Sequence, residues 1–140
     1  MQNGNHEYLC FTILLLMLPL FYVAGDPGDK PHIEYVLAAC LVPVVLFSLL
    51  LWNDPIKHSS IHKIDAVLAK LVIASFVIYT LLFKFKWSYL LLGVAGGTSF
   101  YFSNYYSSKE WCSNQHLAWH ACLHLVCFIA TLYVFFPPPM

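Results

Sequence analysis

Three histidines recur at a four-residue spacing near the C-terminal end of the chain: His116, His120 and His124. In an α-helix this spacing places the side chains in one stripe, because each step climbs about 6 Å and turns only slightly more than a full circle. Two histidines one turn apart can bind the same metal ion, and neutral imidazole is a good zinc ligand. The pattern predicts a metal site with His116 and His120 as ligands. The alternative interpretation is a set of interfacial histidines without a ligand.

Further ionisable side chains precede this stripe. His58 and His62 stand around the start of one apolar segment, and Asp65 follows His62 by three residues on the same helical face. Because a catalytic zinc ion usually has three protein ligands and one water molecule, we predict His62 as the third ligand, with His58 as its substitute. A rigid helical position favours His62 over a loop residue. Asp65 could orient this ligand, or act as a general base toward the water.

Asp65 and Lys70 lie inside an otherwise apolar segment. An ionisable residue within a membrane helix is costly, so Asp65 is a functional candidate. The competing interpretation is that Asp65 faces water or complements the positive end of the helix dipole. Lys70 lies about 140° around the helix from Asp65, and we interpret it as snorkelling toward the membrane boundary.

The elements that position these residues are five apolar segments, each able to cross a hydrocarbon core that is about 30 Å thick. We predict helices at 8–25, 32–52, 60–83, 87–106 and 115–136, the first of them interrupted by Pro19. Ser59 or Ser60 is expected to cap the third helix. Gly93 and Gly97 form a G-x-x-x-G pair in the fourth, which predicts close helix packing or an oligomer contact.

Composition supports an integral membrane protein. Of the 140 residues, 60% are hydrophobic and only 10% are charged, whereas an average soluble domain has about 25% charged residues. Seven lysines balance seven acids and arginine is absent, so we expect membrane lipid as a partner and no nucleic acid. Five cysteines lie mostly within apolar runs, which does not indicate a disulfide framework. The sequence therefore predicts an all-α, single-domain, multi-pass helix bundle covering residues 1–140.

The five crossings divide the loops between two sides of the membrane. The N-terminus and the loops at 53–59 and 107–114 share one side, which we call side A. His58, His62, His116 and His120 all lie near this boundary. The lysines are distributed evenly, so they predict no orientation. The first segment could be a cleaved signal peptide, but it lacks the preceding basic residues that such a peptide carries.

At these residues the chain resembles the CREST superfamily of membrane hydrolases, which includes alkaline ceramidases, progestin and adiponectin receptors and haemolysin III-like proteins. The segment HKIDAVLA at 62–69 is similar to the start of the family's third helix, and HLAWH at 116–120 is similar to its His-x-x-x-His motif. Ser48 lies where the family has a serine near the end of helix two. The resemblance covers roughly residues 45–75 and 114–135.

The resemblance implies a zinc-dependent lipid amide hydrolase in which Asp65 takes a proton and Ser48 holds the oxyanion. Family members usually have seven helices, and their third zinc histidine follows the serine by four residues, where this chain has Trp52. His62 or His58 would have to substitute for it. Two other classes stay open: a non-enzymatic scaffold or receptor with a degenerate site, and a haem or metal-ion protein with histidine ligands.

Overall fold

The computed structural model describes residues 5–25, 28 and 30–136. This part of the chain is helical and contains no strand, which confirms the predicted all-α fold. The elements, in chain order, are α1 (Glu7–Leu14), α2 (Met17–Gly25), α3 (His32–Asn53), α4 (Ser60–Phe83), α5 (Trp87–Lys109) and α6 (Asn114–Phe135). The predicted bounds differ from these by a few residues at most, the largest difference being the three extra residues at the end of α5.

The first predicted helix is broken into α1 and α2 just before Pro19. Proline has no N–H to donate to the carbonyl of Leu15, and its ring crowds that carbonyl. The chain makes shorter turns there, with the Leu18 N–H donating to the Leu15 carbonyl at 3.1 Å. Pro43 lies inside α3 without breaking it.

Four spans of the described chain are long and apolar enough to cross a membrane: Glu7–Gly25, His32–Asn53, Ser60–Phe83 and Asn114–Phe135. The fifth predicted crossing, α5, has 23 residues but ends in the polar sequence SNYYSSK. It does not reach the same level of hydropathy. Many large apolar side chains of the bundle point outward, among them Phe11, Leu82 and Leu91, each about 70% exposed.

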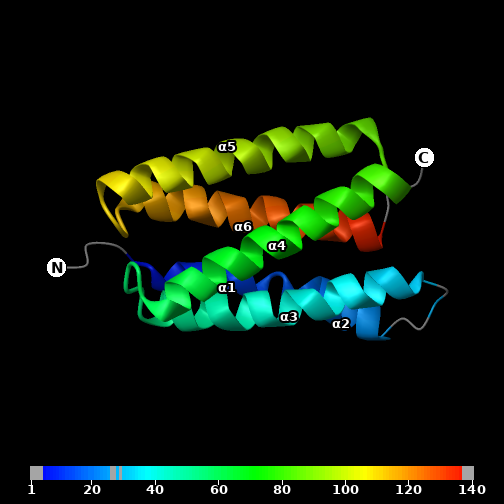
Figure 1. Cartoon of the computed structure of the whole chain (residues 1–140), viewed down its shortest axis with the longest axis horizontal. Helices are drawn as coiled ribbons and strands as arrows, with labels where there is room; N and C mark the ends of the chain where they lie inside the picture. Colours follow the sequence, from blue (N-terminus) through cyan, green and yellow to red (C-terminus); the bar gives the residue numbers. More distant parts are fainter. Residues whose placement is uncertain (1–4, 26–27, 29, 137–140) are drawn as a thin grey trace.

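The helices form two layers that α4 connects. Figure 1 shows α5 and α6 side by side as an antiparallel pair, with α1, α2 and α3 in a second layer and α4 crossing diagonally between the two. The α3–α4 and α5–α6 connections lie at the same end as the start of α1. This end corresponds to side A, so the alternating direction of the predicted helices is confirmed.

The opposite end of the bundle contains a buried ionic cluster, which the sequence did not indicate. Glu34, 1% exposed, forms an ion pair with Lys84 and accepts a hydrogen bond from the Tyr79 hydroxyl at 2.8 Å. The Lys84 ammonium also donates to the Val134 carbonyl at 2.6 Å, and Lys30 donates to the next carbonyl of α6 at 3.0 Å. These lysines satisfy carbonyls that have no partner within the helix and complement the negative end of its dipole.

Candidate functional site

His62 caps the start of α4. The hydroxyl oxygen of Ser59 accepts a hydrogen bond from the His62 backbone N–H at 3.1 Å, as predicted for a capping serine. In return, Nδ1 of His62 accepts the backbone N–H of His58 at 2.9 Å. His58 adopts a positive φ of 64°, which turns its N–H toward the helix. This reciprocal arrangement resembles a capping box, with histidine in place of the usual glutamate.

The start of α6 repeats the same arrangement. Ser113 accepts from the His116 backbone N–H at 3.2 Å, and Nδ1 of His116 accepts the backbone N–H of Cys112 at 3.1 Å. Cys112 has a positive φ of 59°. Two of the three predicted metal ligands, His62 and His116, are therefore helix-capping residues.

Capping fixes the tautomer of both imidazoles. A backbone N–H can only donate, so Nδ1 carries the lone pair and the proton of the neutral ring sits on Nε2. A histidine that binds zinc through Nε2 needs the opposite tautomer, with the lone pair on Nε2 and the proton on Nδ1. In this conformation His62 and His116 present hydrogen-bond donors, and both rings would have to turn before Nε2 could bind a metal ion.

The next two histidines of the stripe connect α6 to other helices. Nδ1 of His120 lies 3.0 Å from the Ser103 hydroxyl of α5, and Nδ1 of His124 lies 2.8 Å from the Thr12 hydroxyl of α1. Thr12 donates its only hydroxyl proton to the Leu9 carbonyl. In that arrangement His124 donates its Nδ1–H to the Thr12 hydroxyl oxygen.

Trp52 lies against the histidines of α6. Its ring centroid is 4.8 Å from that of His120 and 5.9 Å from that of His116, and it stacks on Trp111 at 5.9 Å. Trp111 in turn lies 4.9 Å from His62 and 4.9 Å from His116. We call Trp52, Trp111, His62, His116 and His120 the imidazole–indole cluster. An indole thus stands at the position where the resemblance places the third zinc histidine.

The indole N–H of Trp52 has no hydrogen-bond partner in the described part of the chain. The side chain is only 1% exposed, and a buried donor without an acceptor costs roughly 1–3 kcal/mol. Trp111 differs, because its indole N–H donates to the Pro55 carbonyl at 2.9 Å. An unsatisfied buried donor beside the His116 ring indicates a place for an acceptor.

Ser48 and Asp65, the two predicted catalytic residues, are in contact. The Ser48 hydroxyl of α3 donates to Oδ1 of Asp65 on α4, and both side chains are buried. Helix geometry places Ser48 one turn from Trp52, about 6 Å deeper along α3. This contact agrees with the matching depth that the sequence predicts for Ser48 and Asp65, and their catalytic roles stay a prediction.

Other predicted residues take different places. His58 is exposed, and its ring centroid lies 6.0 Å from that of His62. Within the described residues, no group of three or more histidine, cysteine, aspartate or glutamate side chains is arranged to hold a metal ion. In this conformation a backbone N–H occupies Nδ1 of His62 and of His116, and zinc binding stays a prediction.

The glycine pair of α5 faces open space within the described part of the chain. A Cβ added to Gly93 or Gly97 would meet no atom within 4 Å, whereas one on Gly96 would meet Val126 of α6 at 3.4 Å. Close packing with α6 therefore goes through Gly96. An oligomer contact through Gly93 and Gly97 stays a prediction.

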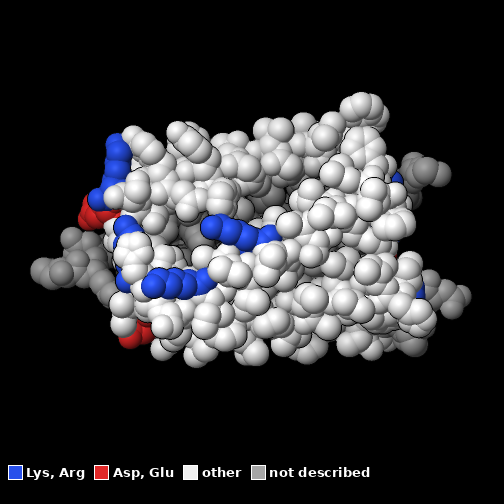
Figure 2. Space-filling view, in the orientation of Figure 1, with Lys and Arg blue, Asp and Glu red and all other residues white. Residues whose placement is uncertain are grey.

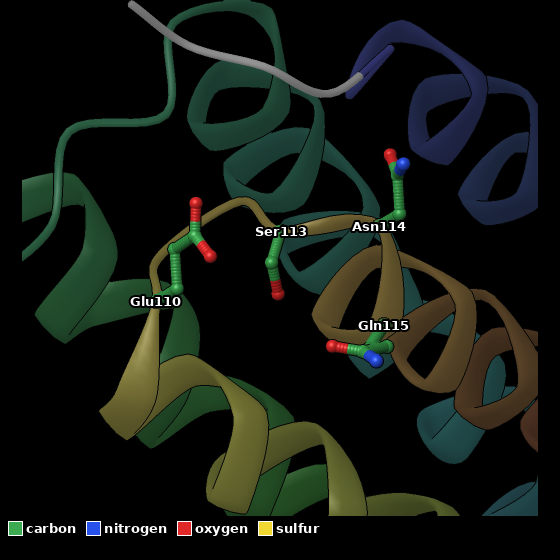
Figure 3. A pocket seen from close by; sticks show the side chains of 4 residues that line it. All are labelled: Glu110, Ser113, Asn114 and Gln115. Atoms are coloured by element: carbon green, nitrogen blue, oxygen red, sulfur yellow. The ribbon is translucent and has the colours of Figure 1, made fainter.

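A shallow hollow at the α5–α6 turn has a volume of about 320 Å³ and is lined by Glu110, Ser113, Asn114 and Gln115. Figure 3 shows these side chains pointing in different directions rather than converging on one point. None of the predicted metal or catalytic residues lines it. It lies beside the capping serine of α6 and offers no arrangement for catalysis.

One signal for the capping arrangement was present in the sequence. Ser59 and Ser113 each stand three residues before a histidine, and a serine followed three residues later by a polar acceptor marks a capping box. The indole between the histidines could not be located in this way, because its position depends on how α3 and α6 pack.

Comparison of the chain with family models, curated proteins and solved structures finds no match. The resemblance to the CREST superfamily therefore rests on the order and spacing of a few residues.

Proposed function

We propose that this chain is a non-enzymatic integral membrane protein whose imidazole–indole cluster binds the carbonyl group of a membrane lipid amide at side A. Membrane insertion is supported by the four long apolar spans and by the outward-facing apolar side chains. The cluster lies at the first turns of α4 and α6. Amphipathic groups gather at this depth of a membrane, and the carbonyls of lipids lie there as well.

The observation that carries this proposal is the set of hydrogen-bond donors. His62 and His116 present Nε2–H because a backbone N–H occupies each Nδ1. The Trp52 indole N–H adds a buried donor without a described partner. These donors are neutral and largely buried, so they match a neutral carbonyl oxygen better than a phosphate, whose charge would be costly to desolvate.

A direct test measures the binding of a ceramide to the full chain in phosphatidylcholine nanodiscs. Trp52→Phe removes the indole N–H while keeping an aromatic ring. One net hydrogen bond contributes about 0.5–1.5 kcal/mol, so we expect photo-crosslinking of a diazirine-bearing ceramide to require roughly two- to tenfold more lipid. The matched control is Trp119→Phe, because Trp119 stacks on Phe102 of α5 and lies outside the imidazole–indole cluster.

Sphingosine, which lacks the amide carbonyl, serves as the second control and should compete weakly with the ceramide probe. Equal competition by sphingosine and ceramide would contradict the proposal. So would an unchanged affinity of the Trp52→Phe variant.

A second candidate, the zinc-dependent lipid amide hydrolase, is favoured by the buried contact between Ser48 and Asp65. The resemblance assigns both residues to that reaction. The two candidates differ in outcome, because a hydrolase releases a fatty acid from the bound ceramide whereas a binding protein leaves it intact. Mass spectrometry of the lipids recovered from the nanodiscs separates them.

A further inference from the structure

Lys70 is an exposed lysine deep inside a membrane-length helix. It lies ten residues after Ser60, the first residue of α4, which corresponds to about 15 Å or nearly three turns. Its exposed neighbours on the same face include Val67, Ala74 and Val77. Within the described chain, Lys70 makes no hydrogen bond, ion pair or ring contact.

The acids among the described residues offer Lys70 no free carboxylate. Glu34 pairs with Lys84, and Asp65 bonds Ser48. The other acids in the described residues stand at helix ends: Glu7, Asp54 and Glu110. A second copy of the chain therefore provides, from its described residues, no unpaired acid at the depth of Lys70.

The face of α4 that carries Lys70 is open. Of the four candidate spans, α4 has the smallest buried share, and it packs mainly on α3 and slightly on α6. Figure 2 shows that the basic side chains on this side of the molecule gather mainly at one end, beside the acidic ones, and that one basic side chain reaches toward the middle, next to a hollow in the surface. The face thus combines uncovered apolar surface with a positive charge near its middle.

Snorkelling does not account well for a lysine at this depth. The Lys70 side chain tilts toward the start of α4, as helical side chains do, and shortens the distance to side A by only part of the three turns. Ionisable residues inside membranes usually pair with one another or line a polar path. A counter-charge at the same depth would satisfy the Lys70 ammonium.

We propose that the face of α4 around Lys70 docks a transmembrane helix of a partner protein that carries an aspartate or glutamate near the middle of its span. The carboxylate pairs with the Lys70 ammonium, and the apolar side chains of both helices pack around the pair. This docking surface lies apart from the imidazole–indole cluster, so it does not depend on the proposed lipid binding.

The test uses a designed single-span polyleucine peptide with one central aspartate and a dansyl acceptor. The full chain is reconstituted in phosphatidylcholine vesicles, and its four tryptophans serve as energy-transfer donors. We expect association of the wild-type chain with this peptide, at least tenfold weaker association for Lys70→Met, and retention for Lys70→Arg. Lys63→Met is the matched control, because Lys63 shares the face but stands in the first turn of α4.

Replacing the peptide aspartate by leucine should abolish the energy transfer. The proposal is overturned if Lys70→Met associates as strongly as the wild type, or if the leucine peptide associates equally well. Adding phosphatidylglycerol, an anionic lipid, tests whether a lipid headgroup pairs with Lys70 instead. The proposal is also overturned if this lipid removes the association and if a peptide with asparagine associates as strongly as the peptide with aspartate.

Discussion

At the residue scale, one histidine spacing is compatible with two different roles. His116 and His120 are one turn apart in α6, as a metal-binding pair would be, but His116 directs its Nδ1 to the Cys112 N–H. His62 does the same with His58. The choice between ligand and cap depends on the left-handed backbone of His58 and Cys112, which no side-chain pattern specified.

The cap of α6 predicts a change in the reactivity of Cys112. This thiol is 2% exposed, and burial raises its pKa, so little thiolate is accessible near neutral pH. His116→Ala removes the acceptor that holds the Cys112 N–H. We expect Cys112 to react with a maleimide at least tenfold faster, as measured by peptide mass spectrometry, because the turn loosens.

His32→Ala at the opposite end of the bundle is the control for this experiment and should leave the labelling of Cys112 unchanged. Equal labelling of Cys112 in His116→Ala and the wild type would show that His116 is not a cap. The raised pKa also predicts that wild-type labelling increases as the pH rises above neutral, since a rising pH generates the reactive thiolate.

At the scale of elements, length and bounding residues were sufficient to locate the helices. Proline and polar residues separate the apolar runs, and Ser59 caps α4 as its position predicted. The ionic cluster at the far end was not predictable, because Glu34, Tyr79 and Lys84 come from two helices and meet the end of a third. Nothing in their local sequence indicates this meeting.

The ionic cluster predicts a large coupling between Glu34 and Lys84. Removing one partner of a buried ion pair leaves an uncompensated charge and costs about 3–5 kcal/mol. We expect Lys84→Met to lower the free energy of unfolding in detergent by about that amount. The double variant Glu34→Gln with Lys84→Met should regain most of it. Lys63→Met, an exposed lysine, is the control, and additive effects of the two substitutions would contradict the coupling.

At the scale of the whole molecule, the packing of the helices brings together residues that are distant in sequence. Ser48 and Asp65 meet between α3 and α4, as their matching depth in the predicted helices indicated. The indole of Trp52 between the histidines and the open face of α4 depend on the packing of complete helices. The sequence pattern thus predicted the depth of these residues along their helices and the direction of each helix. The contacts between side chains of different helices required the structure.

The measurement that tests the account most directly is the zinc content of the purified full chain, expressed with added zinc and dialysed without a chelator. Because His62 and His116 direct protonated Nε2 atoms toward their surroundings, we predict well under one zinc ion per chain by elemental analysis. His62→Ala should leave this value unchanged. One zinc ion per chain that is lost in His62→Ala would contradict the account and restore the hydrolase interpretation.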